Sequence, residues 1–138
     1  MDDKAFYFLV ILISSLYFLL FYIGIRRLHN FQKNSPVISR LEDLQNLKKI
    51  IKLQLKANAI MTQLAFSVFA LFFLKLSLGQ GELVDFLLMI LLLCANFLSQ
   101  VHAHTAQRRI KYMPANSYDL AKKRDQLFSS WRSGILDL

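Results

Sequence analysis

The 138-residue chain is poor in the residues that most catalytic and metal sites use. Its one cysteine, Cys94, stands inside an apolar run, so neither a disulfide framework nor a cysteine-based metal site is expected. Four glycines and two prolines are present, and no phosphate-binding glycine loop, nucleophile elbow or H-E-x-x-H motif occurs. The sequence therefore predicts no enzyme, no catalytic residues and no cofactor.

Acidic residues are also few, nine against 17 lysines and arginines, which gives a formal charge of +8. Eight of the basic residues fall in 26–56 and seven in 108–132, on either side of the last two apolar runs. Such clustering is typical of loops on the cytoplasmic side of a membrane. The excess of positive charge is therefore better explained by membrane topology than by nucleic-acid binding. We expect the N-terminus outside, the C-terminus in the cytoplasm, and a location in a bacterial inner membrane.

Three long apolar runs, 5–25, 57–78 and 83–103, dominate what is present. Each has about the 20 residues that a helix needs to cross a hydrocarbon layer of ~30 Å. Asp2 and Asp3 precede the first run and basic residues follow it, which favours an uncleaved anchor over a signal peptide. We therefore expect an all-α integral membrane protein with three transmembrane helices in a single domain, 1–138.

The basic segment 26–56 is predicted to be cytoplasmic. Residues 28–35 are expected to form a polar connector, and Ser39 is the predicted N-cap of an amphipathic helix, with Glu42 completing a capping box. Because no glycine or proline separates this helix from the second apolar run, one helix is expected from Ser39 to about Leu78. The second and third spans would then form a long helical hairpin that extends into the cytoplasm.

Two cytoplasmic surfaces are candidates for docking or lipid contact. On the first surface, the lysines of the basic helix either meet anionic lipid headgroups or lie on a helix that leaves the membrane. The second interpretation is favoured, because this helix continues without a break into the second apolar run. In the basic tail, 104–138, an amphipathic helix would bury its apolar side in the membrane interface or against a protein. The residues are Lys48, Lys49 and Lys52 on the first surface, and Leu120, Leu127, Phe128 and Trp131 on the second.

Polar side chains recur at helical spacing inside the second and third runs. They are Gln63 and Ser67 on one, and Asn96 and Gln100 with Ser99 beside them on the other. Gln63 and Asn96 both lie about 10 Å from the cytoplasmic ends of their runs at 1.5 Å per residue, so these two amides are expected to pair and hold the hairpin together. Since the outer halves of the runs are apolar, helix–helix contact is favoured over a solute or ion path.

His29 and His102 lie near the cytoplasmic ends of the first and third spans. A haem or metal site between two helices is one interpretation, and interfacial histidines at helix ends is the other and the favoured one. No metal site is therefore predicted.

These patterns predict a non-enzymatic accessory subunit of a larger membrane complex. Its partners would be other membrane subunits and anionic lipid headgroups, with no nucleic acid. The alternative is a homo-oligomeric, membrane-permeabilising protein of the holin or defence-effector kind, since three spans with a basic tail are similar in topology to phage holins.

Overall fold

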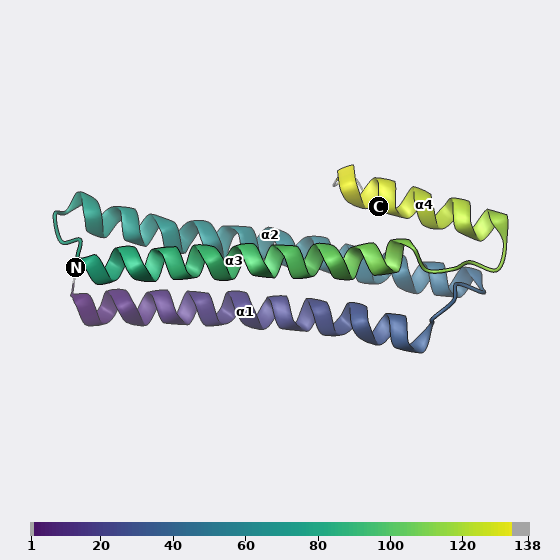
Figure 1. Ribbon diagram of the computed structural model, residues 1–138, viewed down its shortest axis with the longest axis horizontal. Helices are drawn as coiled ribbons and strands as arrows, with labels where there is room; N and C mark the ends of the chain where they lie inside the picture. The colour runs from purple at the N-terminus through teal and green to yellow at the C-terminus, as the bar shows by residue number, and fades with distance from the viewer. Residues whose placement is uncertain (1, 134–138) are drawn as a thin grey trace.

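The computed structural model describes residues 2–133, which form four helices. Three are long, α1 (Asp3–Asn34), α2 (Leu41–Ser77) and α3 (Leu83–Lys111), and they lie side by side with α2 antiparallel to the other two (Figure 1). The short helix α4 (Tyr118–Ser133) folds back along the bundle from the end at which α2 begins. All three long helices are apolar enough to cross a membrane, which confirms the all-α fold with three candidate spans.

Helix α1 is longer than the sequence suggested. It continues past Ile25 to Asn34, so the predicted polar connector is wrong. Leu28 and Phe31 continue the buried stripe of α1 at helical spacing, and both side chains are buried in a hydrophobic core. Their burial stabilises a segment whose composition alone resembles a loop.

Helix α2 is continuous from Leu41 to Ser77, as the lack of glycine and proline predicted. Its N-cap is Arg40, one residue after the predicted Ser39. The side chain of the third helical residue, Asp43, turns back toward the backbone that precedes the helix. The Asp43 carboxylate accepts hydrogen bonds from the backbone N–H of Arg40 at 3.0 Å and of Ser39 at 3.1 Å. Asp43 therefore replaces Glu42 in the expected capping role.

A tight turn links α2 to α3. Gly79 adopts a positive φ of 69°, which an L side chain rarely adopts. Although α2 and α3 are consecutive and antiparallel, α2 packs mainly on α1 and makes few contacts with α3. The two helices of the predicted hairpin therefore leave room between them.

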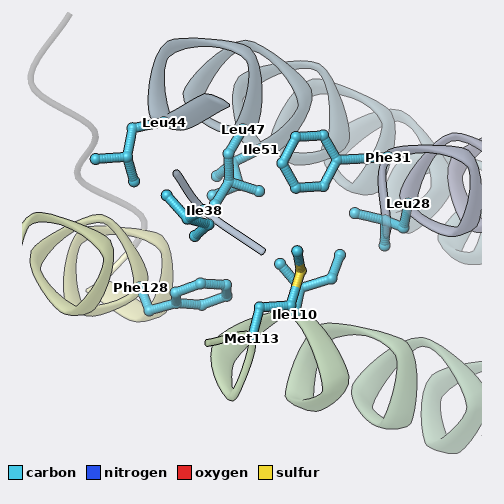
Figure 2. Close-up of a cluster of buried hydrophobic side chains, with 9 residues drawn as sticks. All are labelled: Leu28, Phe31, Ile38, Leu44, Leu47, Ile51, Ile110, Met113 and Phe128. Atoms are coloured by element: carbon cyan, nitrogen blue, oxygen red, sulfur yellow. The ribbon is translucent and has the colours of Figure 1, made fainter. Parts of the chain in front are cut away.

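Two hydrophobic cores hold the bundle together, one near each end. The first contains Phe6 and Val10 of α1 with Val68 and Phe72 of α2. The other, which we call the basic-end core, draws side chains from all four helices and from the linker before α2 (Figure 2). Its buried members are Leu28, Phe31, Ile38, Leu44, Leu47, Ile51, Ile110, Met113 and Phe128.

The two linkers at this end are joined to each other. Ile38 donates its N–H to the carbonyl of Pro114 at 2.9 Å and accepts from the N–H of Asn116 at 3.0 Å. Ser117 then caps α4 by accepting from the N–H of Leu120 at 3.3 Å. These bonds fix the direction in which α4 leaves, so that it packs on α2 and α3.

Candidate functional site

Contacts between α1 and α2 show which of their residues lie at the same height, by which we mean the position along the long axis of the bundle. Phe6 packs edge-on against Phe72 with ring centroids 5.2 Å apart, and Gly24 faces Gln54 so closely that a Cβ there would lie 2.6 Å from the amide oxygen. Along α1 these contacts are about 27 Å apart at 1.5 Å per residue. That separation is close to the thickness of the hydrocarbon layer, ~30 Å.

A buried charged cluster lies at the end where the chain begins. The Lys75 ammonium of α2 contacts the Asp85 carboxylate of α3 at 2.9 Å and the Asp3 carboxylate of α1 at 3.0 Å. It also donates to the Tyr7 hydroxyl at 3.5 Å and lies 4.7 Å from the centre of the Phe6 ring. Lys75 is 1% exposed and Asp85 2%, whereas Asp3 is 59% exposed.

The buried carboxylate of this cluster has several partners besides Lys75. Asp85 accepts from the Tyr7 hydroxyl and from the backbone N–H of Glu82, each at 2.9 Å. Buried ions are tolerated when paired and hydrogen-bonded in this way. The cluster therefore ties one end of α1, α2 and α3 together.

The sequence prediction missed this cluster, although a signal for it exists. Lys75 is the only lysine or arginine between Lys56 and Arg108, and a charge within an apolar run requires a partner. Asp85 lies just past the turn that follows and is the nearest acid in the next run.

The opposite end of the bundle is basic. Two residues beyond the Gly24–Gln54 contact, Arg26 and Lys52 lie at the same height, where the apolar span ends. The buried residues of the basic-end core follow Arg26 on α1 and precede Lys52 on α2, so they lie beyond spans that are about as long as a hydrocarbon layer is thick. The ends of the bundle's own helices therefore form a hydrophobic cluster beyond the apolar spans.

Between these two ends, α2 and α3 enclose a cleft of about 410 Å³, which we call the α2–α3 groove. The buried Tyr17 of α1 contributes to its wall and donates a hydrogen bond to Oδ1 of Asn96. The full lining is Tyr17, Asn58, Met61, Thr62, Ala65, Phe66, Phe69, Asn96 and Gln100. Five of these nine side chains are polar, an unusual lining for a cleft within an apolar span.

The predicted intramembrane residues have separate positions. Asn96 and Gln100 line the groove, and Ser99 is buried with its hydroxyl bonded to the carbonyl of Ala95. Gln63 and Ser67 are exposed on α2, outside the groove. The amide of Asn96 therefore meets Tyr17 of α1, and the expected pairing with Gln63 is not formed.

The predicted docking residues of the tail meet the chain's own core. Phe128 is buried in the basic-end core, and Leu120 and Leu127 pack against it. The side chain of Trp131 lies outside the described part of the chain. The packing of Leu120, Leu127 and Phe128 therefore needs no second protein.

The lysines of the basic helix remain on the surface. Lys48 and Lys49 are exposed and Lys52 is partly exposed.

The two candidate histidines do not share a site. His102 lies beside the ring of Phe21, with centroids 6.3 Å apart, while His29 is eight residues further along α1. That spacing places them about 12 Å apart in height at 1.5 Å per residue. Among the described residues no group of three or more metal-binding side chains occurs.

The groove offers hydrogen-bonding groups between the apolar spans, and the charged cluster holds α1, α2 and α3 together at one end. Comparison with known proteins adds no assignment to these features. No protein-family model matches the chain, and neither a curated protein nor a solved structure matches it.

Proposed function

We propose that this chain is a non-enzymatic subunit of a larger membrane assembly. It would lie in a bacterial inner membrane with its N-terminus outside and its basic end in the cytoplasm. The observation that supports this most directly is the position of Gln63. Its polar amide lies on the side of a membrane-spanning helix that faces away from the bundle.

Gln63 lies midway between Gln54 and Phe72, the two residues of α2 whose contacts mark the ends of the apolar span. Its side chain is exposed, so in a membrane it would face hydrocarbon near the middle of the layer. An amide there needs a hydrogen-bond partner, and polar side chains in spans normally face a bundle interior. A helix of another chain would supply that partner.

The neighbours of Gln63 suit close helix packing. Ala59, Ser67 and Ala70 follow the same exposed face of α2 at helical spacing. Small side chains let two helix backbones approach closely enough for interhelical hydrogen bonds. The basic end would add a second contact, in which Lys48 and Lys49 meet anionic headgroups or acidic groups of the partner.

The test is photo-crosslinking in native membranes from a benzophenone amino acid placed at position 60, because Ile60 is exposed on the same face of α2 one turn from Gln63 and its replacement keeps the amide. A discrete adduct with a different polypeptide is expected from position 60. The matched control is position 91, because Leu91 is also exposed on a spanning helix. The substitution Gln63→Leu should weaken recovery of that partner about threefold to twentyfold, since interhelical hydrogen bonds contribute roughly 0.6–1.7 kcal/mol.

An adduct between two copies of the chain would instead favour the homo-oligomeric, membrane-permeabilising protein. Purified chain in lipid vesicles would then release a trapped dye, which the subunit proposal does not expect. Equal adducts from positions 60 and 91, or none at 60, would contradict the subunit proposal.

A further inference from the structure

The α2–α3 groove is graded in polarity along the bundle. On α2 its lining runs from Asn58 and Thr62 at the basic side to Phe66 and Phe69 deeper in the span. On α3, Gln100 likewise lies closer to the basic end than Asn96. A molecule that fills this groove therefore needs a polar head toward the basic end and an apolar body toward the middle.

The apolar part of the groove continues into the bundle. A smaller void of about 30 Å³ shares Tyr17, Ala65 and Asn96 with it and reaches Val68 and Leu92. The main cleft of about 410 Å³ falls within the 300–1,000 Å³ typical of small-molecule sites.

The groove presents hydrogen-bond donors. Oδ1 of Asn96 is occupied by the Tyr17 hydroxyl, and Oδ1 of Asn58 accepts from Nε2 of Gln54 at 3.2 Å. Both asparagines therefore keep their NH₂ groups for an occupant. The matching head group is one that accepts hydrogen bonds, such as a carbonyl oxygen.

The head group is also expected to be neutral. No lysine, arginine or histidine is among the residues that line the groove, and a buried anion without a cation is strongly disfavoured. Depth excludes a phospholipid ester, which lies at the boundary of the hydrocarbon layer. Asn58 is six residues past Lys52, about 9 Å deeper at 1.5 Å per residue, and Thr62 is deeper still.

We propose that the α2–α3 groove binds a neutral, carbonyl-bearing lipid, with its carbonyl oxygens on the amide donors of Asn58, Asn96 and Gln100. Its apolar part lies along Ala65, Phe66 and Phe69. Two sources share this chemistry, a lipid quinone and a neutral acyl ester. This site is independent of the partner proposed for Gln63, because Gln63 lies outside the groove.

The test uses the full chain purified in mild detergent and titrated with decylubiquinone and, separately, with methyl palmitate. A saturable rise in the midpoint of thermal unfolding is expected with at least one probe, and the stronger probe identifies the source. Hexadecane, which has no acceptor, and phosphatidylglycerol, which has a charged head, should give no saturable rise.

Two substitutions tie binding to the groove. Gln100→Leu, at an exposed position of α3, should weaken binding of the probe about twofold to thirteenfold, the range for one lost hydrogen bond of roughly 0.5–1.5 kcal/mol. Ala65→Phe should fill the cleft and abolish the rise. The matched control Gln107→Leu removes an amide from α3 outside the groove and should bind the probe normally.

The proposal is overturned if neither probe binds saturably, or if hexadecane or phosphatidylglycerol binds as well as the carbonyl probes. It is also overturned if Gln100→Leu and Gln107→Leu bind equally. Because each variant is compared with its own unliganded midpoint, a change in stability alone does not imitate a change in binding.

Discussion

Lys75 opposes folding through the desolvation of its charge and stabilises the fold through its ion pairs. Its ammonium is buried, and the desolvation of such an ion is offset only by well-placed partners. Asp85 supplies a buried opposite charge, and Asp3 supplies an exposed one. Because the exposed charge is screened by solvent, the Lys75–Asp85 pair carries most of the interaction.

We predict that Lys75→Met alone lowers the free energy of unfolding by about 3–5 kcal/mol, the usual cost of leaving one buried charge unpaired. The double variant Lys75→Met with Asp85→Asn should recover most of that loss, because the amide keeps an oxygen for the N–H of Glu82. Asp3→Asn should change stability little. Titration with SDS from detergent micelles, followed by circular dichroism, measures all three. A double variant as unstable as Lys75→Met would show that the charge pair itself is needed.

Among the helices, the start of α2 depends on a titratable cap. The backbone N–H of Ser39 donates to Asp43, and this bond lowers the pKa of the carboxyl below its ordinary value of 3.8, with help from the N–H of Arg40. A lowered pKa in the folded chain means that the carboxylate stabilises the fold. That stabilisation is complete above the ordinary pKa and is lost as the pH falls through the lower, folded value.

We predict that Asp43→Ala destabilises the start of α2 by about 0.5–2 kcal/mol near neutral pH, the range for a lost N-terminal cap. Hydrogen exchange at the amides of Ser39 and Arg40 should become faster in this variant. In the native chain the same amides should lose protection in acid, below the ordinary pKa of the carboxyl. Asp43→Asn keeps an acceptor but cannot titrate, so protection that still falls in acid in this variant would assign the effect to another group.

The elements differ in how far the sequence predicts them, for physical reasons. Length and hydropathy predict the three spans, because a membrane helix needs only a local apolar run. The extension of α1 through Leu28 and Phe31 was missed, because its burial depends on core residues such as Ile51 and Ile110, which are distant in the sequence. The groove itself was not predicted: Asn96 and Gln100 were expected at helix–helix contacts, and the sequence does not reveal the rotation of α1 that brings Tyr17 to Asn96.

At the scale of the whole molecule, charge and height divide the bundle into three zones. The charged cluster closes one end, about 30 Å of apolar helix follows, and the basic-end core completes the other. Of 17 lysines and arginines, 15 belong to the segments at the basic end. The exceptions are Lys4 and Lys75, and Lys75 is paired with Asp85, so the excess of positive charge lies almost entirely at the basic end.

This asymmetry predicts the orientation of the chain in the membrane. Positively charged segments are retained on the cytoplasmic side, so Asn46 should lie inside and Gln80, in the turn between α2 and α3, outside. After Cys94→Ser removes the native thiol, Gln80→Cys in intact cells should react with a membrane-impermeant maleimide, and Asn46→Cys should react only after permeabilisation. Permeabilised cells are the control, because both positions are exposed and should then label equally. Labelling of position 46 but not of position 80 in intact cells would reverse the orientation and place the basic-end core outside.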